Sequence, residues 1–142
     1  MEDKKRVLIL CTGNSARSQM AEGLLKNIVG DRFEVFSAGT IATFVRPEAI
    51  TALSELGIDI SNNRSKSVDE FVDRDIDYVL TVCDNAKENC PYFPAKTKLV
   101  HQAFDDPAFV PGDEARLAAF RRVRDEIKTY LESDFVPMLS RS

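Results

Sequence analysis

The chain has 142 residues, of which 44% are hydrophobic and 30% are charged, and its formal net charge is −4. This composition is typical of a globular protein, and we expect one domain over residues 1–142. An acidic chain lacks the basic surface of nucleic-acid-binding proteins, so we exclude that class of function.

The sequence contains no apolar run long enough to span a membrane, and the run near its N-terminus is too short for a secretory signal. We therefore expect a cytoplasmic protein, acting as a monomer. Three cysteines, an odd number, argue against a framework of structural disulfides. A single histidine, His101, and the lack of a Cys-x-x-Cys pair argue against a bound metal, which leaves thiol chemistry open.

The apolar pattern predicts alternating strands and helices. Residues 6–12 are apolar at consecutive positions, as in a strand that is buried on both faces. Apolar residues then recur at helical spacing up to residue 29, before Gly30. In chain order we expect a strand over 6–12, a helix from 15 or 17 to 29, a strand over 33–40, a helix over 46–57, a short helix over 67–74, strands over 76–83 and 97–104, and a long helix over 113–139 that Pro137 kinks or ends.

Four strands with intervening helices predict an α/β fold, in which a four-stranded parallel sheet lies between two layers of helices. Ligands bind to such sheets beyond the carboxyl ends of the strands. Cys11, Cys83 and the pair Asp105 and Asp106 each follow a predicted strand. We therefore expect these groups to lie together at one edge of the sheet.

The segment CTGNSARS connects the first strand to the first helix. We expect its backbone N–H groups to form a nest for a tetrahedral oxyanion, with Gly13 adopting an unusual φ and Arg17 binding two anion oxygens. The same surroundings favour the thiolate of Cys11, and the Ser18 hydroxyl can donate to it. The expected oxyanion-binding loop consists of Thr12, Gly13, Asn14, Ser15, Ala16, Arg17 and Ser18.

A thiolate beside an oxyanion site indicates nucleophilic attack on a phosphate-like centre. The alternative is a buried cysteine at a strand end, followed by an ordinary capped helix. The strand before the loop, the helix after it and the Gly-Asn pair inside it favour the functional interpretation.

The segment CTGNSARSQMAEG resembles the phosphate loop of the low-molecular-weight tyrosine phosphatases, and more closely that of the thioredoxin-coupled arsenate reductases built on the same fold. The stretch Ser18-Gln19-Met20 is similar to the reductase form. The resemblance continues through FSAGT, GIDIS, TVCDNAKENCP and FDDPA, over nearly the whole chain. It implies the low-molecular-weight phosphatase-like fold and the reduction of arsenate to arsenite, an arsenic detoxification.

The resemblance also implies a relay of three cysteines, because the reductases carry a cysteine pair with the spacing of Cys83 and Cys90. Cys11 attacks arsenate, Cys83 then forms a transient disulfide with Cys11, and Cys90 forms the final disulfide with Cys83. Thioredoxin reduces that disulfide, and phosphate or sulfate competes with arsenate. From the residues alone, the less favoured alternative is that Cys83 is a core cysteine at a strand end and Cys90 an incidental loop cysteine.

In the family the general acid precedes a proline, and this role carries over to Asp106, with Asp105 in a position to share or tune the proton. The alternative function is a phosphatase that hydrolyses phosphate monoesters through a Cys11 phosphoenzyme. Related phosphatases place tyrosines after the Asp-Pro pair, whereas this chain has Ala108 and Phe109, which disfavours that alternative.

Asn14, Glu22 and Ser37 match positions that bind a monovalent cation in some reductases of the family. A lysine ammonium from the NNRSKS segment, such as that of Lys66, could occupy the place of potassium, so we expect no bound cofactor. The simpler alternative is that the three polar residues only brace the loop by hydrogen bonds.

Overall fold

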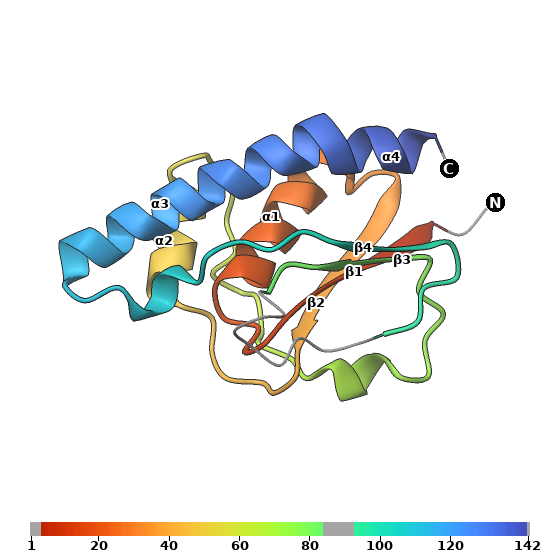
Figure 1. Ribbon diagram of the computed structural model, residues 1–142, viewed down its shortest axis with the longest axis horizontal. Helices are drawn as coiled ribbons and strands as arrows, with labels where there is room; N and C mark the ends of the chain where they lie inside the picture. Colours follow the sequence, from red (N-terminus) through yellow and green to blue (C-terminus); the bar gives the residue numbers. More distant parts are fainter. Residues whose placement is uncertain (1–3, 84–92, 142) are drawn as a thin grey trace.

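The computed structural model describes residues 4–83 and 93–141 (Figure 1). Its sheet has four parallel strands in the order β2-β1-β3-β4. The strands are β1 (Lys5–Cys11), β2 (Phe33–Gly39), β3 (Tyr78–Thr81) and β4 (Lys98–His101). The helices are α1 (Arg17–Val29), α2 (Pro47–Ser54), α3 (Asp113–Tyr130) and α4 (Val136–Ser140), with 3-10 turns η1 (Val68–Phe71) and η2 (Pro107–Phe109) and a π turn η3 (Leu131–Phe135).

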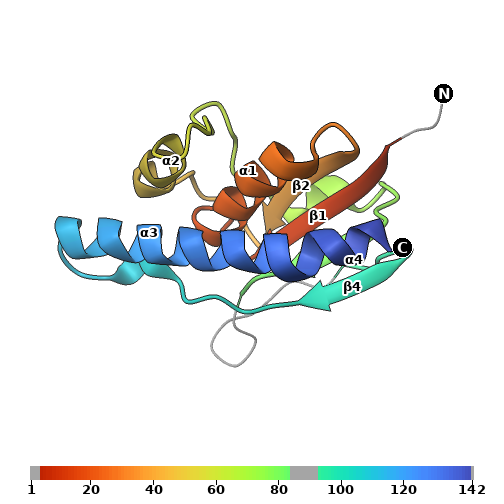
Figure 2. The ribbon, with the colours of Figure 1, turned by 90° about the horizontal axis from the view of Figure 1, so that it is seen from above.

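The two faces of the sheet are covered unequally. Residues 7–10 of the central strand β1 are fully buried, as the run of apolar residues predicts. One face packs against α1 and α3, whereas Phe71 of η1, Ile76 and Phe93 cover the other (Figures 1 and 2). The predicted three-layer fold with a four-stranded parallel sheet is confirmed, and its second outer layer is a single 3-10 turn with irregular chain. None of the described helices is long and apolar enough to cross a membrane.

Strands β3 and β4 are shorter than the predicted ranges 76–83 and 97–104. Strand β4 lies at the edge of the sheet and is mostly exposed. Single backbone bonds nevertheless extend the pairing, because Val82 N donates to Leu10 O and Phe104 N donates to Val82 O. The first bond holds the segment after β3 against the end of β1, and the second holds the segment after β4 against the segment after β3.

The sequence predicts that Pro137 kinks or ends the long C-terminal helix. The helix does not end there. It continues to Ser140 through η3, where the N–H of Val136 donates to Leu131 O, five residues earlier. Proline has no N–H to donate, and its ring presses against the carbonyl four residues before it. The wider π turn placed directly before Pro137 accommodates both effects.

Gly23 lets α1 pack closely against the chain around α2. A Cβ at this position would lie 2.5 Å from Leu53 Cδ1 and 2.8 Å from Ile60 Cγ2. Real side chains do not tolerate such contacts, so a larger residue must push α1 away from its neighbours. Since α1 begins with Arg17, this packing also fixes the position of the loop.

We expect Gly23→Ala to lower the free energy of unfolding by about 1–2 kcal/mol, because overpacking costs about 1–3 kcal/mol and the gain in helix propensity returns less than 1 kcal/mol. Urea denaturation followed by circular dichroism measures the change. Asn27→Ala, at an exposed site on the same helix, is the control and should not destabilise the protein. A Gly23→Ala variant as stable as wild type would contradict the packing argument.

Candidate active site

The loop of residues 12–16 connects β1 to α1 at the carboxyl edge of the sheet, with Cys11 ending the strand and Arg17 beginning the helix. The residue before the helix, Ala16, supplies no side-chain cap, and the first turn contains no acidic residue. The N–H groups of the first turn and the positive end of the helix dipole therefore face the loop without a competing carboxylate from this turn. This environment suits a bound anion.

A chain of buried hydrogen bonds leads from the Cys11 thiol to Glu22. Cys11 Sγ lies 2.8 Å from Ser18 Oγ. Asn14 Nδ2 donates to Ser18 Oγ at 2.8 Å and to Ser37 Oγ at 2.9 Å. Ser37 Oγ in turn donates to Glu22 Oε1 at 2.7 Å. The loop, α1 and β2 are thus joined directly beneath the thiol.

The partners of Asn14 determine the direction of these bonds. Asn14 Oδ1 accepts from the backbone N–H of Lys66 and from Gln19 Nε2, so its amide nitrogen must face the two serines. Ser18 Oγ accepts from Asn14 and keeps its own proton available for the sulfur. The Ser18 hydroxyl can therefore donate a hydrogen bond to the Cys11 sulfur.

The expectation that Gly13 adopts an unusual φ is wrong, because the positive φ in the loop, 49°, belongs to Asn14. Asparagine tolerates the left-handed region, and hydrogen bonds at both ends of its side chain offset the cost here. The close approach that needs a glycine is at Gly39 in β2. A Cβ there would lie 2.5 Å from Thr12 O and 2.8 Å from Asn14 N.

Cys11, Arg17 and Asp106 line one cavity of about 460 Å³. The Arg17 guanidinium lies 3.4 Å from Asp106 Oδ2 and donates to Phe104 O at 3.2 Å. Asp106 Oδ1 accepts the N–H of Ala108, which fixes the carboxyl group at the start of η2. The structure thus brings together the predicted nucleophile, anion-binding arginine and proton donor.

The rim of this cavity is apolar and exposed. Ile41, Phe44 and Phe109 line it with 59%, 54% and 79% of their surface exposed. The Arg46 guanidinium lies 5.1 Å from the centre of the Phe44 ring. A tetrahedral anion held by the loop would therefore sit beneath an open, partly aromatic entrance.

Asp105 does not join this group. Its side chain is 73% exposed and lies 3.5 Å from the Arg122 guanidinium of α3, outside the cavity lining. The carboxyl group of Asp106 turns inward because it accepts the Ala108 N–H, whereas Asp105 has no such bond in the described part of the chain. Proton sharing between the two aspartates has no support in this geometry.

Cys83 is fully buried in the same core cluster as Cys11. In the pairing of β1 with β3, Leu10 faces Thr81, so two more residues along this register bring Cys83 to the start of the loop. Cys11 has a free thiol in this structure. Cys90 lies outside the described residues.

A lysine side chain lies beside Glu22, one of the three residues matched to a cation site. Glu22 is only 3% exposed, and Lys66 Nζ lies 3.9 Å from its Oε1 while donating to Arg64 O. Burial lowers the pKa of the Lys66 ammonium, and the Glu22 carboxylate opposes this effect. Lys26, half exposed, also contacts Glu22. Across residues 4–83 and 93–141, no cluster of three or more His, Cys, Asp or Glu side chains could hold a metal ion.

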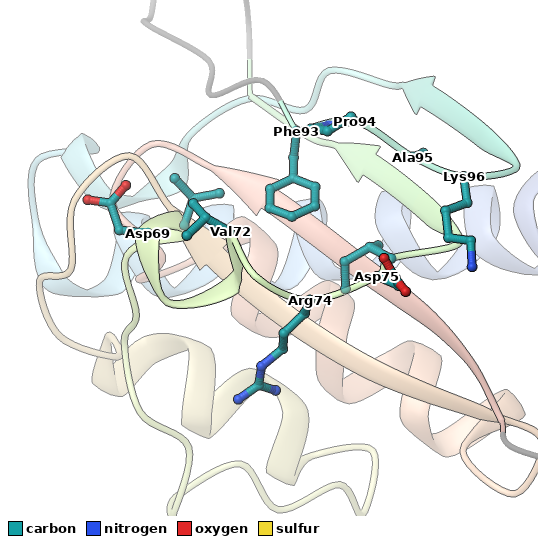
Figure 3. Close-up of a pocket in the computed structure, with 10 residues that line it drawn as sticks. Asp69, Val72, Arg74, Asp75, Phe93, Pro94, Ala95 and Lys96 are labelled. Atoms are coloured by element: carbon teal, nitrogen blue, oxygen red, sulfur yellow. The ribbon is translucent and has the colours of Figure 1, made fainter.

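A second cavity, of about 470 Å³, lies on the face of the sheet covered by η1 (Figure 3). The Phe93 ring projects into it, and Val72, Pro94 and Ala95 add further apolar lining. Its charged residues are Asp69, Arg74, Asp75 and Lys96. Among the described residues, its lining includes no cysteine and none of the predicted catalytic residues, whereas Cys11, Arg17 and Asp106 line the first cavity.

Several residues that hold the loop have no signal in the sequence. Thr43 and Ser65 bond to Gly13 O, and Asn63 bonds to Glu22 and Gln19. They lie in segments without regular structure, where neither hydropathy nor spacing singles them out. In the sequence, the segment NNRSKS, which contains Asn63 and Ser65, stands out only as the source of a lysine beside the loop.

Comparison with known proteins places these features in a family. Residues 6–136 match the model of the low molecular weight phosphotyrosine protein phosphatases. Arsenate reductase 2 of Staphylococcus epidermidis is 50% identical over 131 residues, which cover 92% of this chain and 96% of that protein. A solved arsenate reductase in the phosphate binding state is 32% identical, with a TM-score of 0.72 over 90% of this chain and 94% of its own.

The thioredoxin-dependent arsenate reductase Cg_ArsC1' of Corynebacterium glutamicum is also similar, at 28% identity and a TM-score of 0.66. The match covers 93% of this chain and 62% of that one. The family match spans nearly the whole sequence, including the loop, both ends of the sheet and the Asp-Pro pair. The chain belongs to the low molecular weight phosphotyrosine protein phosphatase family.

Proposed function

We propose that this protein is an arsenate reductase that uses three cysteines in sequence and takes its electrons from thioredoxin. The observation that carries the proposal is the pairing of β1 with β3, which sets Cys83 at the same edge of the sheet as the free thiol of Cys11. A phosphatase needs the first sulfur and has no use for the second. The 50% identity to an arsenate reductase supports the same choice.

In the first step the Cys11 thiolate attacks arsenic in a bound arsenate. The loop N–H groups and Arg17 stabilise the oxygens, and Asp106 protonates the oxygen that leaves as water. The product is a Cys11–arsenic(V) adduct. Attack of Cys11 on the phosphorus of a phosphate monoester would be the same kind of first step. Weak phosphatase activity is therefore compatible with this site.

Two exchanges then complete the reduction. Cys83 attacks the sulfur of Cys11, the electron pair of the sulfur–arsenic bond passes to arsenic, and arsenite leaves. Cys90 attacks Cys83, which releases Cys11 as a thiolate and leaves the Cys83–Cys90 disulfide for thioredoxin. We expect one chain to act alone, without a bound organic cofactor, in the cytoplasm, where thiols are kept reduced. Phosphate and sulfate should compete with arsenate for the loop.

Cys90→Ser should release about one arsenite per enzyme and then stop, because the Cys11–Cys83 disulfide can no longer be passed on. Cys83→Ser should release none, since the Cys11 adduct has no second sulfur to attack it. Arsenite is measured with thioredoxin, its reductase and NADPH present. Repeated turnover of arsenate by Cys90→Ser would contradict the relay. No arsenite from the wild type, with hydrolysis of an aryl phosphate unchanged by Cys90→Ser, would instead favour the phosphatase alternative.

Asp106→Asn should lower the rate of arsenite formation roughly 10²–10⁴-fold, because the amide cannot protonate the leaving oxygen. The amide oxygen can still accept the Ala108 N–H, so the fold should be kept. Asp105→Asn is the matched control and should change the rate little, since Asp105 faces Arg122. Single-turnover assays measure both variants. Equal losses in the two variants would contradict the assignment of Asp106 as the acid.

We expect Lys66 to replace a monovalent cation beside Glu22, so exchanging potassium for tetramethylammonium should leave the melting temperature of the wild type unchanged. Lys66→Met should lower the melting temperature by about 5 °C, because the buried Glu22 carboxylate loses the more buried of its two ammonium partners, and potassium should restore part of the loss. Lys26→Met, which removes a more exposed partner of Glu22, is the control. Stabilisation of the wild type by potassium would contradict this assignment.

A further inference from the structure

Four consecutive carbonyl groups of the loop accept hydrogen bonds from outside it. Three of these carbonyls accept from residues 41–46, which we call the strap, and the carbonyl of Asn14 accepts from α1. In order, Ile41 N donates to Thr12 O (3.2 Å), Thr43 Oγ1 to Gly13 O (2.7 Å), Gln19 Nε2 to Asn14 O (3.2 Å) and Arg46 N to Ser15 O (3.0 Å).

These bonds determine where the N–H groups of the loop point. In a trans peptide, the carbonyl and the following N–H point in opposite directions within one rigid plane. When Thr43 holds the Gly13 carbonyl outward, the N–H of Asn14 must turn toward the concave side of the loop. A donor fixed in advance is worth more to a bound oxyanion than one that must reorient.

The Gly13 carbonyl differs from its neighbours because side-chain hydroxyls hold it. Thr43 Oγ1 donates to it at 2.7 Å and Ser65 Oγ at 3.2 Å, and the Thr43 N–H donates to Ser65 Oγ at 2.9 Å. The Thr12 and Ser15 carbonyls accept backbone N–H groups, which a substitution leaves in place. The orientation of the Gly13–Asn14 peptide therefore depends on two side chains.

We propose that Thr43 is a positioning residue for the oxyanion loop, acting through the Gly13 carbonyl on the N–H of Asn14. This inference rests on the proposed role of the loop as the arsenate site. Thr43 makes its contribution from the strap, a segment without regular structure, and lies at the rim of the cavity that contains Cys11.

Thr43→Val keeps the shape of the side chain but removes the hydroxyl. It should lower kcat/KM for arsenate about tenfold and weaken competitive inhibition by inorganic phosphate by a similar factor. The effect is smaller than the roughly 10²–10³-fold loss of an oxyanion donor itself, because Ser65 and water still reach the carbonyl. Thr43→Val/Ser65→Ala should lose more than either single variant, and Thr43→Ser should behave as wild type.

Nuclear magnetic resonance separates positioning from general destabilisation. Phosphate should shift the Asn14 amide resonance in wild type and Thr43→Ser, and shift it less in Thr43→Val at the same concentration. Thr51→Val, at an exposed position on α2, is the matched control and should bind phosphate as wild type does. Unchanged phosphate inhibition in the double variant would overturn the inference, even if the wild type reduces arsenate. A wild type that binds phosphate but reduces no arsenate would overturn the proposed function alone.

Discussion

The carboxamide of Asn14 is the contact on which the candidate site depends. Its oxygen accepts from Lys66 and Gln19, and its nitrogen donates to Ser18 and Ser37. These bonds hold the backbone of Asn14 in the left-handed region, which turns the loop around a central point. They also leave the Ser18 proton for the Cys11 sulfur. One side chain thus couples the curvature of the loop to the hydrogen bonding of the Cys11 sulfur.

Much of this arrangement could be predicted from the sequence, because the relevant signals are local. Consecutive apolar residues identify β1, and helical spacing identifies α1 and the long C-terminal helix. Parallel strands then bring their carboxyl ends together, which is why Cys11 and Asp106 reach one edge. Arg17 follows from its place at the start of a helix after a short loop. These three residues line the same cavity, as expected.

The rest depends on contacts between residues far apart in the chain. Thr43 is 30 positions from Gly13, and Ser65 is 52 positions from it. Neither the hydropathy nor the residue spacing near Thr43 or Ser65 predicts these hydrogen bonds. The positive φ falls on Asn14 because side-chain bonds formed only in the folded protein support it. Asp105 turns to Arg122 of α3, a partner brought near by tertiary packing. Hydropathy and spacing carry no information on such pairings.

The strand order also bears on how such an enzyme can arise. The anion cradle is built from the turn after β1 and from segments that support it from behind, whereas Cys83 follows β3, the neighbouring strand. The sulfur to which we assign the second step of the reaction is therefore encoded apart from the loop that we propose binds the anion. Substitutions after β3 could therefore add redox chemistry to a hydrolase of this fold, or remove it. The loop after β1 would not need to change in either case.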